Sequence, residues 1–204
     1  MPVADRSPWN HNIAYHPLVL AAAPSPCGRA LDVGCGTGLL LSELSGRCRE
    51  VVGIDLDPVA LAAAASRLTR VDNVMLLQAD VFTADLPDAG FDLVTAVASL
   101  HHLPLRTGLT RLATLVHPGG RLVVVGLYRA STAADYLTSA AAFPVANLLG
   151  WWRGHTPVGA PTQDAITTLR DIRVVAGDVT PGARIRRRLL FRYTLVWTRP
   201  AQQT

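Results

Sequence analysis

Short apolar runs alternate with helical patterns between residues 30 and 127 of this chain. The runs are rich in Val, Ile and Leu, which is typical of strands buried on both faces. Strands are expected at 30–33, 50–54, 73–79, 91–97 and 121–127, and helices at 39–44, 58–70 and 107–116. Asp57 before Pro58 indicates a helix start, because Asp caps free N–H groups and Pro fits the first helical position. The alternation predicts right-handed βαβ units and an α/β fold with a mostly parallel sheet.

The C-terminal third has a different pattern. A helix rich in small residues is expected at 130–149, followed by a loop with Trp151 and Trp152. A further helix is expected at 164–176, and two strands at 183–191 and 193–198. The chain shows no internal repeat and no second composition regime, so we expect one domain.

Composition supports a packed core and argues against several other classes of protein. Half of the 204 residues are hydrophobic and 17% are charged, which argues against disorder. The start of the chain lacks the apolar core of a signal peptide, and Pro144 and Asn147 interrupt the longest apolar stretch. We therefore expect a cytoplasmic protein with no membrane contact.

The cysteines and arginines carry little functional signal. Cys27, Cys35 and Cys48 are odd in number and lack C-x-x-C spacing, which argues against a disulfide scaffold or a zinc site. All the basic residues that make up the net charge of +4 are arginine. They cluster only near the end of the chain, at Arg184, Arg186, Arg187, Arg188 and Arg192. Charge that protects an exposed strand explains this cluster better than nucleic-acid binding.

A glycine-rich segment follows the first predicted strand. Residues 31–38 read LDVGCGTG, so the glycines fall at Gly34, Gly36 and Gly38. Glycines let the backbone turn tightly and approach a ligand. The dinucleotide fingerprint G-x-G-x-x-G would need a glycine where Leu39 stands, so the spacing disfavours a nicotinamide cofactor. Asp32, just before the glycines, suits a ligand that carries a cationic amino group and a sulfonium.

This segment resembles the glycine-rich motif of class I S-adenosylmethionine-dependent methyltransferases. Residues 51–58 (VVGIDLDP), 80–81 (DV), 91–94 (FDLV), 100–104 (LHHLP) and 115–120 (LVHPGG) resemble later motifs of that family, in order. The resemblance implies a Rossmann-like sheet of seven strands in the order 3-2-1-4-5-7-6, with the last strand antiparallel. It also implies a cofactor site formed by Asp32, Gly34, Gly36, Gly38, Asp55, Leu56, Asp80, Val81 and Val97. In that site Asp55 binds the ribose hydroxyls and Asp80 the adenine amine.

The resemblance divides the expected single domain, 1–204, into four parts. Residues 1–28 form an N-terminal lid segment and 29–127 the cofactor-binding core. Residues 128–165 form a cap insertion and 166–204 the C-terminal helix and strand pair. The N-terminal segment is either a docked helix or a lid in which His11, Tyr15 or His16 lines the pocket. Trp151 and Trp152 either form an apolar pocket wall or pack in a core or dimer contact.

The implied reaction is in-line transfer of a methyl group from S-adenosylmethionine to a small-molecule acceptor, without a metal and without nucleic acid. Positioning alone contributes much of such catalysis, so no catalytic residue is assigned. His101 and His102 are candidates for a general base, although a structural role is favoured for both. A protein that binds the same cofactor without methylating is the alternative. The atom that is methylated and the oligomeric state, including a homodimer, are left open.

Overall fold

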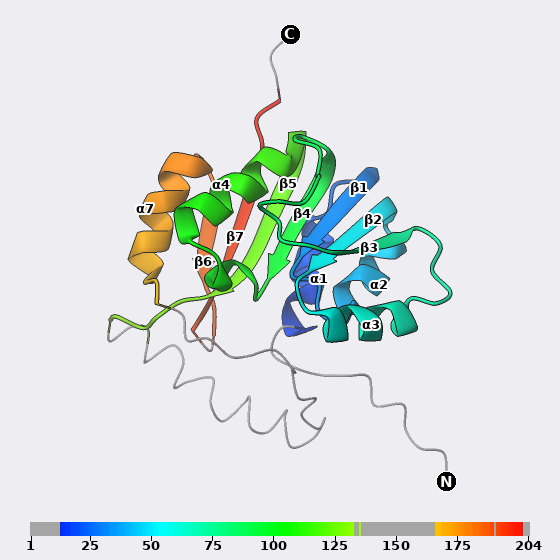
Figure 1. Ribbon diagram of the computed structural model, residues 1–204. Coiled ribbons are helices and arrows are strands. Elements are labelled where there is room, and N and C mark those ends of the chain that lie inside the picture. Colours follow the sequence, from blue (N-terminus) through cyan, green and yellow to red (C-terminus); the bar gives the residue numbers. More distant parts are fainter. Residues whose placement is uncertain (1–12, 133–134, 136–165, 190, 202–204) are drawn as a thin grey trace.

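A seven-stranded sheet forms the centre of the protein (Figure 1). The computed structural model describes residues 13–132, 135, 166–189 and 191–201. The strands are β1 (Cys27–Val33), β2 (Cys48–Asp55), β3 (Val74–Gln78), β4 (Phe91–Val97), β5 (Val116–Leu127), β6 (Arg184–Arg187) and β7 (Arg192–Thr198). Their order is β3-β2-β1-β4-β5-β7-β6. The first five strands run parallel, and β7 is antiparallel to both β5 and β6. The predicted order and direction are confirmed.

Helices cover both faces of the sheet (Figure 1). One face packs against α1 (His16–Ala22), α2 (Leu39–Ser45) and α3 (Pro58–Arg67), and the other against α4 (Leu105–Leu115) and α7 (Leu169–Val179). Neighbouring strand residues point to opposite faces. Ala30 therefore belongs to the α1–α3 core and Leu31 to the α4–α7 core. Single-turn 3₁₀ helices lie at Ile13–Tyr15 and Leu100–His102.

Local chemistry sets the elements that lead to the site. The Asp57 carboxylate accepts a hydrogen bond from Val59 N at 2.9 Å and caps α3, as the sequence predicts. Gly53 in β2 lets α2 pack closely, because a Cβ there would collide with Leu41 and crowd Cys35. The α2 helix therefore lies directly on β2. The glycine-rich loop that joins β1 to α2 covers only residues 34–38.

Several predicted boundaries are wrong for physical reasons. β5 begins at Val116 without a separate turn, because Val116 pairs with Phe91 and Gly119 N donates to Arg199 O. The strand expected at 183–191 covers only Arg184–Arg187. The helix expected at 164–176 is Leu169–Val179, because Thr168 and Asp171 form a capping box at its start.

The odd number of cysteines argues against a disulfide scaffold, but the structure contains a disulfide. Cys27 and Cys48 begin β1 and β2, are partners in the parallel register, and form a disulfide. The register of β1 and β2 brings the two cysteines together, and the number of cysteines in a sequence does not reveal that register. The bond joins positions separated by 21 residues, and closing a loop of that size stabilises a fold by about 3 kcal/mol. The loop contains α2 and the glycine-rich segment. Cys35 is free and buried.

The arginine cluster lies at the edge of the sheet, on and beside β6. Arg184 and Arg186 are exposed on β6, while Arg187 forms an ion pair with Asp135 at 3.1 Å. Exposed charge on an edge strand opposes pairing with another chain. Among the described residues, no helix is both long and apolar enough to cross a membrane.

Candidate functional site

The predicted site residues gather at the carboxyl ends of the central strands. Asp32 and Gly34 lie at the end of β1, Asp55 at the end of β2 and Val97 at the end of β4. These strands are neighbours and run parallel. Open α/β sheets bind ligands at this edge. The arrangement makes a binding site out of residues that are far apart in the sequence.

The glycine-rich loop folds back onto the end of β2. Gly34, Gly36 and Gly38 have positive φ angles of 74°, 53° and 74°, a conformation that L side chains disfavour. Gly34 N and Cys35 N donate to Ile54 O at 2.8 and 3.1 Å. These bonds fix the loop beside β2, so its backbone faces the end of the strand.

The first and second glycines are needed for different reasons. A Cβ at Gly34 would collide with the Ser99 side chain, whose Oγ donates to Val33 O at 2.5 Å. A Cβ at Gly36 would meet nothing within 4 Å, so the space in front of Gly36 is open. Gly34 therefore serves packing between β1 and the loop after β4, whereas Gly36 leaves room for a ligand to reach the backbone.

Asp32 is a buried carboxylate with an unusual environment. Only 3% of it is exposed, and its Oδ1 accepts a hydrogen bond from Thr95 Oγ1 at 2.6 Å. Burial raises the pKa of Asp32 from 3.8 to about 6, opposed by the Thr95 hydrogen bond and by His16. Among the described residues no cation lies within ion-pair distance of this carboxylate. A buried anion of this kind favours a cationic ligand.

Asp55 is more constrained than its position suggests. Its Oδ2 accepts a hydrogen bond from Gly36 N at 2.7 Å, and its Oδ1 accepts one from Asp57 N at 3.0 Å. Sequence reasoning places a free carboxylate here, facing an open cleft. The structure shows a carboxylate that also ties the glycine-rich loop to β2. Each oxygen has a second lone pair, so both can still accept from a ligand diol.

The remaining predicted cofactor residues line the same edge. Leu56 follows β2 and is 64% exposed, which leaves an apolar surface free beside Asp55. Asp80 lies two residues beyond β3, and its Oδ1 accepts from Phe82 N at 2.9 Å. The Val81 side chain is buried in the core. Val97 is half-buried at the end of β4. Cys35 faces the core, where burial and the charges of Asp32 and Asp55 raise its thiol pKa.

Comparisons with known proteins find methyltransferases. Residues 31–124 match the methyltransferase domain family. An uncharacterized methyltransferase of Mycobacterium tuberculosis is 40% identical over 197 residues, covering 95% of this chain and 98% of that protein.

The chain belongs to the S-adenosylmethionine-dependent methyltransferases.

Two further likenesses extend the comparison. The ubiquinone biosynthesis O-methyltransferase of Aeromonas salmonicida is 36% identical over 107 residues, half of this chain and 44% of that protein. The crystal structure of the N-methyltransferase NodS from Bradyrhizobium japonicum with S-adenosyl-L-homocysteine has a TM-score of 0.64 at 16% identity. It covers 94% of this chain and 89% of NodS. At that identity the likeness shows the shared fold.

The two histidines of the methyltransferase differ sharply. His102 is exposed, whereas the Nδ1 atom of His101 is buried and has no hydrogen-bond partner among the described residues. Burial, then the nearby His102 and Arg192, lower the pKa of His101 to about 4. The sequence treats the two as a pair, and only the structure separates them.

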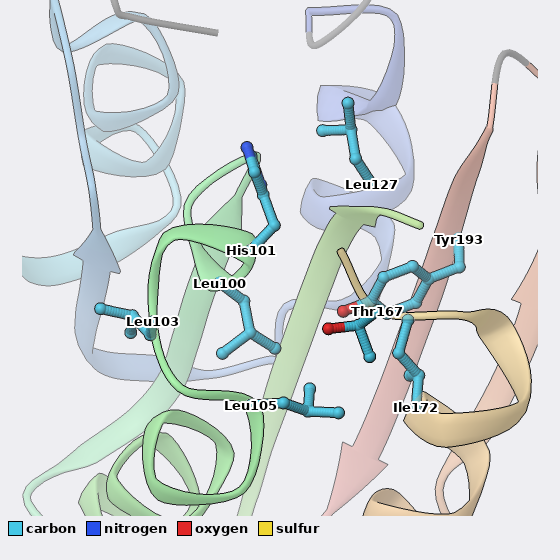
Figure 2. Close-up of a pocket in the computed structure, with 8 residues that line it drawn as sticks. All are labelled: Leu100, His101, Leu103, Leu105, Leu127, Thr167, Ile172 and Tyr193. Atoms are coloured by element: carbon cyan, nitrogen blue, oxygen red, sulfur yellow. The ribbon is translucent and has the colours of Figure 1, made fainter. Parts of the chain in front are cut away.

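His101 borders a small cavity (Figure 2). The cavity has a volume of about 10 Å³ and is lined by Leu100, His101, Leu103, Leu105, Leu127, Thr167, Ile172 and Tyr193. In Figure 2, Leu100, Leu105 and Ile172 surround the cavity, and the Thr167 and Tyr193 hydroxyls point toward its interior. Five of the eight described lining residues are Leu or Ile, and the other three are polar. The buried lining residues Leu100, Ile172 and Tyr193 belong to the core between the sheet and the α4–α7 layer.

The N-terminal candidates fall in different places. His16 starts α1 and is buried, and its Nδ1 lies 3.0 Å from Glu43 Oε1 on α2. Arg121 on β5 donates to Ala22 O at 2.8 Å and holds the other end of α1. The Tyr15 hydroxyl donates to Leu189 O at 3.5 Å. His11, Trp151 and Trp152 lie outside the described residues.

Sequence reasoning missed four residues in this region. Thr95 contacts Asp32 across strands, and only strand register reveals that contact. Ser99 contacts Val33 from the loop after β4. Thr167 and Tyr193 come from the C-terminal third, where no family motif guides the analysis. Among the described residues, no group of three or more His, Cys, Asp or Glu side chains could hold a metal ion.

The role of Gly36 is testable with a matched control. Gly119 also has a positive φ, 85°, and a Cβ there would also meet nothing within 4 Å. Gly36→Val and Gly119→Val should therefore lose similar stability, about 1–3 kcal/mol each from backbone strain. Only Gly36→Val should abolish binding of S-adenosylhomocysteine in calorimetric titrations, because its side chain fills the open space. Equal affinity in the two variants would contradict the placement of the ligand.

Proposed function

We propose that this methyltransferase transfers a methyl group by in-line displacement to a hydroxyl group on a small, mainly apolar acceptor. The cavity walls suit an acceptor with an apolar part, because five of the eight described lining residues are Leu or Ile. The cavity holds only about 10 Å³, space for one water-sized probe. In this proposal it forms the floor of the acceptor site and not the whole of it.

The residues at the strand ends fit the cofactor. Gly36 leaves backbone space open, Asp32 offers a buried negative charge, and Asp55 offers carboxylate lone pairs. Asp32 would hold the cationic amino group and Asp55 the ribose hydroxyls. Leu56, Asp80, Val81 and Val97 would border the adenosine. When bound, S-adenosylmethionine supplies an electrophilic methyl group on a sulfonium that leaves as a neutral thioether.

The observation that carries the choice of a hydroxyl is the position of His101, which lines the cavity and has a buried Nδ1 atom without a hydrogen-bond partner among the described residues. Burial also lowers the pKa of His101 to about 4. Its imidazole is neutral at physiological pH, so one ring nitrogen can accept a proton. A hydroxyl is a poor nucleophile while it keeps its proton, so a neutral base that takes this proton as the methyl group arrives speeds the transfer. A methylated amine stays protonated near neutral pH, because ammonium groups have pKa values near 10. It would not give its proton to His101.

The relatives give limited support to the same choice. The partial matches include proteins named as O-methyltransferases, among them the Aeromonas enzyme. The alternative of a cofactor-binding protein that does not methylate gains no support, since the relatives at 40% identity are named methyltransferases. The absence of nucleic acid among the partners, the cytoplasmic location and the homodimer stay predictions.

Parallel variants of the two histidines test the proposal. His101→Ala should lower kcat with a hydroxyl acceptor by about 100-fold, the usual contribution of a general base. His102→Ala should lower it only a few-fold, because the exposed His102 does not line the cavity. The assay uses methyl-labelled S-adenosylmethionine with panels of phenols, alcohols and amines, and calorimetry checks that both variants bind S-adenosylhomocysteine normally. Methylation of amines alone, or equal loss in both variants, would rule out this assignment.

A further inference from the structure

We propose that Thr95 is a positioning residue for the cofactor, whose hydroxyl holds the Asp32 carboxylate so that its other oxygen receives the cationic amino group. This inference rests on the proposed role of Asp32. Thr95 lies on β4 and is the register partner of Asp32 on β1. It is fully buried, and its Oγ1 lies 2.6 Å from Asp32 Oδ1. No described residue donates a hydrogen bond to Asp32 Oδ2.

The Thr95 hydroxyl has two acceptors but only one proton. Besides Asp32 Oδ1 it lies 3.2 Å from Leu31 O. When Asp32 is ionised, the proton points to the carboxylate, because a charged acceptor makes the stronger bond. When Asp32 is protonated, its own proton can go to Thr95 Oγ1, and the hydroxyl then donates to Leu31 O. Thr95 is therefore satisfied in both states, but it stabilises the charge only in the first.

Charged groups from three other elements surround this pair. His16 on α1 favours the ionised form of Asp32, and Asp55 on β2 opposes it. Glu43 on α2 contacts His16 and not Asp32. The Cys35 thiol of the loop is held in its neutral form. Thr95 is thus the neutral hydrogen-bond donor that keeps a desolvated carboxylate charged, since burial raises the Asp32 pKa to about 6.

Removal of the Thr95 hydroxyl should change the ionisation of Asp32 and leave the packing around residue 95 nearly unchanged. Val has nearly the shape of Thr and suits a buried strand. In Thr95→Val, Asp32 loses its donor, so its pKa should rise further and the neutral form should persist at higher pH. The cationic group of the ligand then meets an uncharged partner. In Thr95→Ser the hydroxyl returns, and the function should return with it.

Calorimetric titrations between pH 5 and pH 8.5 test the inference. The proteins are the wild type, Thr95→Val, Thr95→Ser and His16→Gln. The ligands are S-adenosylhomocysteine, which has the amino group, and methylthioadenosine, which lacks it. The wild-type affinity for S-adenosylhomocysteine should fall as the pH falls through about 6. In Thr95→Val this midpoint should rise by about one pH unit, so the affinity should drop about 10-fold at pH 5 but only about two-fold at pH 7.

The controls separate the alternatives. Thr95→Ser should behave like the wild type. In His16→Gln the affinity for S-adenosylhomocysteine should still fall through a midpoint as the pH falls. Methylthioadenosine should bind both Thr95 variants alike at every pH. An unchanged midpoint in Thr95→Val would overturn the inference and leave the Asp32 assignment standing. Loss of the pH dependence in His16→Gln would also overturn it, because His16 would then be the titrating group. A wild type that binds S-adenosylhomocysteine no better than methylthioadenosine would instead contradict the proposed role of Asp32.

Discussion

Asp32→Asn should stabilise the ligand-free methyltransferase and at the same time lower its affinity for S-adenosylhomocysteine about 100-fold. Folding raises the pKa of Asp32 from 3.8 to about 6, so the ionised carboxylate destabilises the fold at neutral pH. A shift of that size corresponds to about 3 kcal/mol, of which we expect about 1–3 kcal/mol to be recovered in the variant. Asn keeps an oxygen that can accept from Thr95 but carries no charge for the ligand.

The stability difference between the wild type and Asp32→Asn should change with pH in one direction. A carboxyl group with a raised pKa binds its proton more tightly in the folded state. Wild-type stability should therefore rise relative to Asp32→Asn as the pH falls from about 6 toward 3.8. Urea unfolding of both proteins at several pH values measures this difference. A variant that is less stable at neutral pH, or that binds the ligand as before, would show that Asp32 is not a strained, ligand-directed carboxylate.

Asp55→Ala should weaken S-adenosylmethionine and S-adenosylhomocysteine alike, by about 10- to 100-fold, because hydrogen bonds to a charged acceptor contribute about 1.5–3 kcal/mol. The sequence alone suggests that stability should not change. The structure changes that expectation, because the Asp55 carboxylate also accepts from Gly36 N and Asp57 N. We therefore expect the free energy of unfolding to fall by about 1–2 kcal/mol as well.

Asp57→Ala is the matched control for Asp55→Ala. Asp57 caps α3 through Val59 N and stands two residues from Asp55. Loss of an N-cap costs about 1 kcal/mol, so the two variants should have comparable stability. Thermal unfolding and calorimetric titration, measured on both variants, then separate the loss of fold from the loss of the ligand contact. If Asp57→Ala lost as much affinity as Asp55→Ala, the effect would belong to the loop and not to the diol contact.

The sequence predicts the parts of the fold that depend on local pattern and on family motifs. The short apolar runs gave the five parallel strands, and the glycine-rich motif led to the strand order. Asp55 could be placed at a strand end because it directly follows a buried apolar run, and Asp32 could be placed there because it stands just before the glycine-rich loop. Asp57 could be recognised as a cap from its position before Pro58 alone.

The features that the sequence did not predict arise from contacts between strands. The Cys27–Cys48 disulfide and the Thr95–Asp32 hydrogen bond both depend on register, which no local pattern encodes. His101 and His102 look equivalent in the sequence, because their burial depends on the packing of the loop after β4. The two hydrogen bonds to Asp55 depend on how the glycine-rich loop folds back onto β2.

The central claim is that the carboxyl edge of this sheet binds S-adenosylmethionine. Parallel calorimetric titrations of the wild-type protein with S-adenosylhomocysteine and with a nicotinamide dinucleotide test it most directly. We expect saturable binding of S-adenosylhomocysteine at one site per chain, lost in Gly36→Val, and no binding of the dinucleotide. Binding of the nicotinamide dinucleotide without binding of S-adenosylhomocysteine would show that this edge does not bind S-adenosylmethionine.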